Sequence, residues 1–182
     1  MKPAYVVTEG ESEVKILQKL LPQSIEKNIQ FVAGSRDSVD SLSNSILGSK
    51  RVPVAIIVDA NTDDELLIYE HQDFLHYSLN QVAGRVPFKI LFAVPAIESI
   101  FFQDQPLLEK LVNHKFTALE WEFAQYHPKK SLTYFLGDNP LSVMLTNLTD
   151  QAIAIWQQHP FITELVEFLS SVIDNKAVTN NS

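Results

Sequence analysis

Residues 54–65 of the chain read VAIIVDANTDDE, and this stretch decides the fold class. Five apolar residues run from Val54 to Val58 without a break, and Asp59 follows them directly. A short, uninterrupted apolar run is typical of a strand that is buried on both faces of a parallel sheet. Ligands of open α/β sheets bind just beyond the carboxyl ends of such strands. We therefore expect Asp59 to open a metal or phosphate site.

Strand-like and helix-like segments alternate through the first half of the chain. Strands are predicted at residues 4–8, 29–33, 53–58 and 88–94, and helices between them at residues 12–21, 35–47 and 63–83. Crossovers of this length return each strand in the same direction. The pattern predicts an α/β fold: a Rossmann-like, mainly parallel four-stranded sheet flanked by helices.

The pattern changes after Pro95, where only helical segments follow. They are predicted at residues 96–102, 106–112, 117–125, 140–148, 149–157 and 160–173. We interpret them as a helical C-terminal extension on the same sheet. The expected organisation is a single domain over residues 1–173, with a core at 1–105 and the extension at 106–173, followed by a flexible polar tail at 174–182.

Composition excludes several classes of protein. The chain has 182 residues, of which 46% are hydrophobic, which is enough for a packed core. It has no cysteine, which excludes disulfides and thiolate metal sites, and no apolar run long enough to span a membrane. A cytoplasmic protein is the simplest interpretation. The net charge of −8 argues against a free-standing protein that holds nucleic acid by bulk electrostatics.

Three acids follow the first predicted strand in the sequence EGESE, and two of them, Glu9 and Glu13, are site candidates. Glu9 ends that strand, Gly10 allows a sharp turn, and Glu13 lies four residues beyond Glu9. Both carboxylates would then face the carboxyl edge of the sheet, where Asp59 lies. The structural alternative is that acids in a first helical turn only complement the helix dipole.

Further oxygen ligands lie just after Asp59. Asn61, Asp63 and Asp64 follow within five residues. Thr62 and Glu65 have the spacing of a helix capping box, which would explain an acidic first turn without any site. Capping does not explain Asp59, because a carboxylate after a buried strand needs a partner. Clustered hard oxygen ligands suit Mg²⁺ or Mn²⁺.

Glu98 and a pair of lysines complete the candidate set. Glu98 follows the fourth strand among apolar neighbours, which favours a site residue over a helix-start residue. Lys129 and Lys130 follow Pro128, and taken alone they would be a solvated pair. An acidic site that handles phosphate usually needs a cation to offset charge, so either lysine is a candidate. The histidines lack zinc-site spacing, and no P-loop, GxGxxG or GxSxG is present.

Three segments together resemble a Toprim domain. They are VVTEGESE (6–13), IIVDANTDD (56–64) and AVPAIESIFF (93–102), and the chain is most similar to stand-alone Toprim-like proteins and to the Toprim half of the OLD-family nucleases. The family's Glu-Gly-acid motif matches Glu9, Gly10 and Glu13, and its Asp-x-Asp matches Asp59 and Asn61. The segment WQQHPFITELVEFL (156–169) resembles the end of such stand-alone proteins.

The resemblance implies hydrolysis of phosphodiester bonds in nucleic acid with Mg²⁺ or Mn²⁺. The implied metal ligands are Glu9, Glu13, Asp59, Asn61, Asp63 (or Asp64) and Glu98. Glu9 would also serve as general base, and Lys129 (or Lys130) would offset the charge of the phosphate.

Asn61 departs from the family pattern, because it replaces a charged ligand with a neutral amide. This departure supports a different interpretation: a catalytically weak or inactive module that acts through a protein partner, such as an ATPase in DNA repair or phage defence. A third alternative is a metal-dependent phosphohydrolase of small molecules.

Overall fold

The structure is a computed structural model, and it describes residues 4–179, with side chains to residue 174. The first half contains β1 (Ala4–Thr8), α1 (Glu11–Leu20), α2 (Gln23–Glu26), β2 (Ile29–Ala33), α3 (Val39–Ser45), the π-helix η1 (Ile46–Lys50), β3 (Val54–Asp59), α4 (Glu65–Ala83) and β4 (Phe88–Ala93). The second half contains the 3-10 helix η2 (Ile97–Gln103), α5 (Gln105–Val112), α6 (Ala118–Tyr126), α7 (Pro128–Leu136), α8 (Pro140–Thr146), α9 (Asp150–Trp156) and α10 (Pro160–Thr179).

The sheet has four strands in the order β2-β1-β3-β4, and all of its pairs are parallel. The predicted α/β fold class is therefore confirmed. The chain moves outward from β1 to β2, and then returns past β1 to add β3 and β4 on the other side. The direction of winding thus reverses between β1 and β3. In open α/β sheets this reversal is where the connecting loops diverge and leave a crevice at the carboxyl edge.

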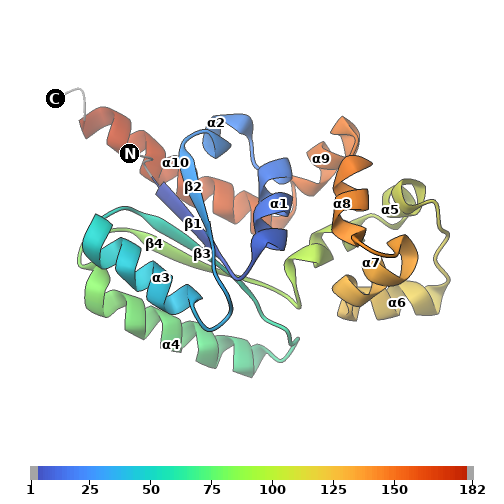
Figure 1. Cartoon of the computed structure of the whole chain (residues 1–182), viewed down its shortest axis with the longest axis horizontal. Helices are drawn as coiled ribbons and strands as arrows, with labels where there is room; N and C mark the ends of the chain where they lie inside the picture. The colour runs from blue at the N-terminus through green and yellow to red at the C-terminus, as the bar shows by residue number, and fades with distance from the viewer. Residues whose placement is uncertain (1–3, 180–182) are drawn as a thin grey trace.

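Alternating side chains of the strands feed two separate cores, one on each face of the sheet. On one face Val7, Ile56 and Val58 pack with α3, η1 and α4. On the other face Val6 and Ile57 pack with α1, η2, α9 and α10. Figure 1 shows α3 and α4 on one side of the sheet and α1 and α10 on the other. Both faces are buried, which explains the unbroken apolar run of β3.

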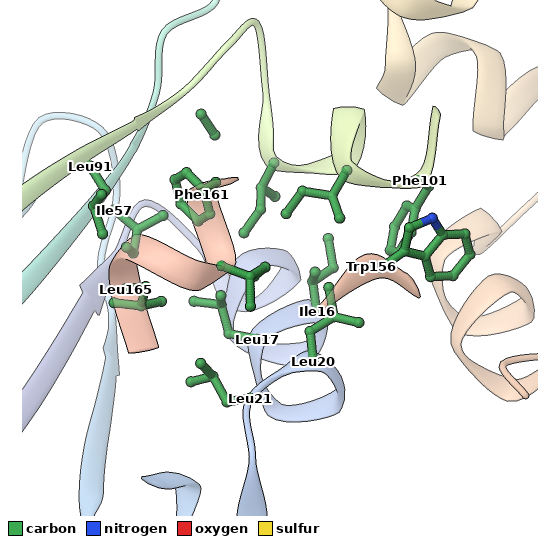
Figure 2. Close-up of a cluster of buried hydrophobic side chains, with 14 of the residues drawn as sticks. Ile16, Leu17, Leu20, Leu21, Ile57, Leu91, Phe101, Trp156, Phe161 and Leu165 are labelled. Carbon is green, nitrogen blue, oxygen red and sulfur yellow. The ribbon is translucent and has the colours of Figure 1, made fainter. Parts of the chain in front are cut away.

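The C-terminal helices share a core with the sheet. Phe161 and Leu165 of α10 lie against Ile57 and Leu91 of the strands, and Trp156 lies against Phe101 (Figure 2). Helices α5 to α8 gather beyond the carboxyl end of the sheet, next to η2 (Figure 1).

Several helix bounds differ from the prediction. The segment 35–47 was expected to form one helix, but α3 begins at Val39 because Ser35 and Ser38 form a hydrogen-bonded turn before it. Helix α10 continues to Thr179, since no glycine or proline follows Ile173 to end it. Most of the predicted tail is therefore helical, and residues 180–182 lie outside the described part of the chain.

Candidate functional site

Two of the candidate acids lie at the carboxyl ends of neighbouring strands. Glu9 directly follows β1, Asp59 ends β3, and these strands pair side by side at the point where the winding reverses. Burial and the nearby charge of Asp59 raise the pKa of Glu9 above its usual value. Arg36, which follows β2, partly opposes this increase. The two carboxyl groups therefore face the same edge of the sheet, as the strand ends predicted.

Asp59 is fully buried, at 0% exposure, and both of its carboxylate oxygens accept hydrogen bonds. Its Oδ1 accepts from the backbone N–H of Ile97 at 2.9 Å, and its Oδ2 accepts from Lys129 Nζ at 2.6 Å. Strand alternation explains this direction: Val58 points toward α4, so Asp59 points toward α1 and η2. The buried charge thus has the partners that burial demands.

Lys129 lies at the centre of the acids. Its Nζ is 2.6 Å from Asp59 Oδ2, 3.7 Å from Glu13 Oε1 and 4.0 Å from Glu98 Oε2. Burial alone would lower the pKa of Lys129, but the hydrogen bond to Asp59 and the charge of Glu98 outweigh it and raise that pKa. The ammonium is therefore held charged among the carboxylates. Both lysines are exposed, but only Lys129 makes these contacts with the acids within the described residues.

The helix that carries Lys129 is not among those predicted from the sequence. No helix was predicted at 126–139, yet α7 spans Pro128–Leu136. Two signals were present: a proline at the first helical position, and apolar residues at Leu132, Phe135 and Leu136, spaced for one helical face. This helix places Lys129 in its first turn, where the side chain can reach back to the ends of the strands.

Glu13 and Glu98 are both buried, with exposures of 4% and 5%. Each has an Oε2 atom that makes no hydrogen bond within the described residues. Gly10 leaves room for one of them, because a Cβ atom there would lie 3.1 Å from Glu13 Oε2. The φ angle of Gly10 is −168°, which any residue adopts, so its role is space and not the sharp turn that was expected. Two buried carboxylate oxygens thus accept no hydrogen bond from the described residues, and the nearest cation to that of Glu98 among them is Lys129 Nζ at 4.0 Å.

Burial has its clearest effect on Glu98. It raises the pKa of Glu98 to about 7 from the ordinary 4.5, in spite of the opposing charge of Lys129. The charges of Asp59 and Glu13 add to the increase. At neutral pH this carboxyl group is therefore close to half protonated.

Replacing Glu98 with glutamine should stabilise the protein in a pH-dependent way. Wild type holds the Glu98 proton up to about pH 7, whereas an ordinary glutamate releases it near 4.5. Wild type therefore loses stability relative to the variant as the pH rises through this window. Urea unfolding in EDTA should show similar stabilities below pH 4.5 and a variant more stable by roughly 3 kcal/mol above pH 7. A difference that is constant with pH would contradict this assignment.

Asn61, Thr62 and Asp64 make contacts within their own loop or with the start of α4. Asn61 adopts a left-handed backbone, with a φ of 55°, and its Nδ2 donates to the backbone oxygen of Asp59 at 3.0 Å. Asp64 is the N-cap of α4 and accepts from the N–H groups of Leu66 and Leu67. The cap is therefore Asp64, not Thr62, because Thr62 Oγ1 instead accepts from the N–H of Asp64. Asp63 is exposed in the loop before α4.

Lys129 faces Asp59, Glu13 and Glu98, and Glu9 lies close to Asp59. The structure does not bring Asp63 into this group. Within residues 4–179, no three histidine, aspartate or glutamate side chains are spaced to hold a metal ion as they are placed. The donor type nevertheless fits a divalent cation, because hard carboxylate oxygens converge here and two of them accept no hydrogen bond in the described part of the chain. Lys129 would give up its contact with Asp59 when such a cation binds.

Comparison of the chain with family models, with curated proteins and with solved structures finds no match. Among the described residues, no helix is both long and apolar enough to cross a membrane. The function therefore has to be argued from the site itself.

Proposed function

We propose that this chain binds Mg²⁺ or Mn²⁺ and hydrolyses phosphodiester bonds in nucleic acid. The cation would bind at the acidic edge, which is the carboxyl edge of the sheet where Glu9, Glu13, Asp59 and Glu98 lie. One observation carries the proposal: buried carboxylates from α1, β3 and η2 face a single lysine from α7 at the carboxyl edge of the sheet. The resemblance to Toprim domains supplies the reaction and the substrate class.

A purely structural role explains this cluster poorly. Burying a carboxylate costs several kcal/mol unless its oxygens are hydrogen-bonded, and Glu13 and Glu98 each leave one oxygen without a hydrogen bond among the described residues. Perturbed acids at a sheet edge are typical of functional sites. The arrangement favours a site that exchanges cations over one that stabilises the fold.

Each residue has a part that follows from its position. Glu13, Asp59 and Glu98 would hold the cation, and the carbonyl oxygen of Asn61 is a weaker ligand that would first have to turn toward it. A bound cation polarises the phosphate and lowers the pKa of a bound water. Glu9, half-buried and with a raised pKa, is placed to accept the proton of the attacking water. Lys129 would pair with a phosphate oxygen once released from Asp59.

The net charge of −8 is compatible with this proposal, because the charge that matters for a substrate is the local charge at the site. Lys129 lies among the acids, and a bound cation would neutralise them further. We therefore expect weak but measurable binding of nucleic acid without divalent cations, and cleavage that depends strongly on them.

Replacing Lys129 with methionine should lower metal-dependent cleavage by about 100-fold, because the phosphate loses the ammonium group that lies among the acids. Purified protein is incubated with plasmid, single-stranded DNA and RNA in Mn²⁺, Mg²⁺ or EDTA. Lys130→Met removes the same charge from the exposed neighbour and should retain more than a third of the wild-type rate. Equal loss in both variants would show that only the general charge of α7 matters.

A second candidate function is a non-catalytic module that binds a protein partner such as an ATPase. Two observations favour it: the amide of Asn61 is used in a backbone hydrogen bond, and apolar side chains lie exposed on α6 and α7 at Leu119, Phe123 and Tyr134. In that case the same assay shows no cleavage with either metal. Calorimetry with Mn²⁺ and Mg²⁺ would then show no binding at the acidic edge.

A further inference from the structure

A hollow lies at the same edge of the sheet as the acids, on the side of α4. It has a volume of about 500 Å³ and is lined by Arg36, Asn61, Thr62, Leu67, His71 and Phe92, among others. Glu13, Asp59, Glu98 and Lys129 do not line it. The hollow is therefore a neighbour of the acidic site and not part of it.

The lining of this hollow combines one cation with flat and apolar surfaces. Arg36 is exposed and supplies a guanidinium group, which suits a phosphate. The rings of His71 and Phe92 lie edge to face at 5.2 Å, and Leu67 adds an apolar wall. Burial and the charge of Arg36 lower the pKa of His71, which favours the neutral form of this ring. Asn61 and Thr62 add hydrogen-bonding groups.

This combination is the chemistry of a nucleotide site. Aromatic and apolar faces take a base, amide and hydroxyl groups contact its edges, and a guanidinium group takes the phosphate. A volume of about 500 Å³ lies within the range of small-molecule pockets. One nucleotide is therefore a suitable occupant in both size and chemistry.

The hollow is also the first of three that follow one another past Lys129. Asn61 lines both this hollow and the next, which has a volume of about 290 Å³ and includes Lys129 and Lys130. Lys129 also lines a third, of about 320 Å³, together with Glu98 and Lys15. Adjacent hollows thus share a residue, and each contains at least one cation. An extended single strand needs adjacent hollows of this kind, so that one nucleotide can bind on each side of the phosphodiester bond to be cut.

We propose that the hollow around Arg36 holds one nucleotide of a single-stranded substrate, with its phosphate on Arg36 and its base against His71 and Phe92. The neighbouring phosphodiester then lies beside Lys129 and Asp59. This assignment rests on the proposed function, because it places the strand relative to the acidic edge.

Binding is tested by fluorescence anisotropy with a labelled single-stranded DNA of about ten nucleotides, in EDTA so that nothing is cut. Arg36→Ala should weaken binding about tenfold and reduce the slope of log K against log salt by about 0.7, the value for one lost single-strand phosphate contact. Arg36→Lys should recover part of the affinity. His71→Ala should weaken binding without changing the slope, because it removes a base contact and no charge.

Arg85→Ala is the matched control. Arg85 is an exposed arginine between α4 and β4, at the opposite edge of the sheet. This variant loses the same charge and should bind like wild type. Equal affinities of the Arg36 and Arg85 variants, or no binding by wild type, would overturn the assignment. A deoxynucleoside monophosphate that binds as tightly as the strand would also overturn it, because the hollow would then serve a free nucleotide.

Failure of this assignment and failure of the proposed function are separate results. Selective loss of binding in Arg36→Ala, with no cleavage by wild type in Mn²⁺, supports the nucleotide hollow and removes the nuclease. Cleavage by wild type with equal binding by both arginine variants supports the nuclease and removes the hollow.

Discussion

Replacing Asp59 with asparagine should lower metal-dependent cleavage at least 100-fold, which is the largest effect on activity that we expect. Asp59 is the acid that both places Lys129 and faces Glu9. Asparagine keeps the shape of the side chain but removes the charge that holds a cation, and with it the stabilisation of charge developing on the phosphate. Initial rates on single-stranded DNA in Mn²⁺ measure the effect.

Asp73→Asn is the control for this variant, because Asp73 is exposed on α4. It changes the net charge equally and should leave the rate within about twofold, as surface substitutions usually do. Thermal unfolding of both variants separates loss of activity from loss of fold. If Asp59→Asn is folded and cleaves as fast as wild type, the acidic edge is not the active site.

Replacing Trp156 with alanine should destabilise the protein by about 3–5 kcal/mol, which is the largest effect on stability that we expect. Trp156 is fully buried, and its ring lies 4.9 Å from that of Phe101 in an edge-to-face contact. Phe101 belongs to η2, the helix that also carries Glu98 and donates the N–H of Ile97 to Asp59. The cavity left by the indole would therefore loosen the wall of the site as well as the core.

Urea unfolding monitored by circular dichroism measures this effect, since the change removes one of the fluorescent tryptophans. Leu119→Ala is the control, because Leu119 is 76% exposed and its loss should change stability by less than about 0.5 kcal/mol. A cost below about 1 kcal/mol for Trp156→Ala would mean that the C-terminal helices contribute little to the core that they share with the sheet.

The strands and the acids at their ends could be predicted from the sequence because both are local signals. An unbroken apolar run gives a buried strand, and the first polar residue after it lies at the edge of the sheet. This reasoning placed Glu9, Asp59 and Glu98 at the edge. It also identified Glu13, whose position follows from the helix that begins directly after β1.

The rest of the site depends on contacts between distant parts of the chain. Lys129 and Lys130 are equivalent in the sequence, and only the docking of α7 distinguishes them. Asp63 and Asp64 have the composition of ligands, but the start of α4 uses Asp64 as its cap and leaves Asp63 in solvent. The hollow around Arg36 is lined by residues that follow β2 and β3 and by residues of α4 and β4. No single segment of the sequence therefore predicts it.

The long separation between Asp59 and Lys129 has a consequence for folding. Residues 1–105 contain the whole sheet and Glu13, Asp59 and Glu98, but the lysine that neutralises them lies on a helix that is synthesised later. Without Lys129, burial of these three carboxyl groups would cost free energy. This cost opposes complete packing of residues 1–105 by themselves. We therefore expect the carboxyl edge of the sheet to pack fully only after α7 has been synthesised. A formed acidic site would then mark a chain that has folded at least as far as α7.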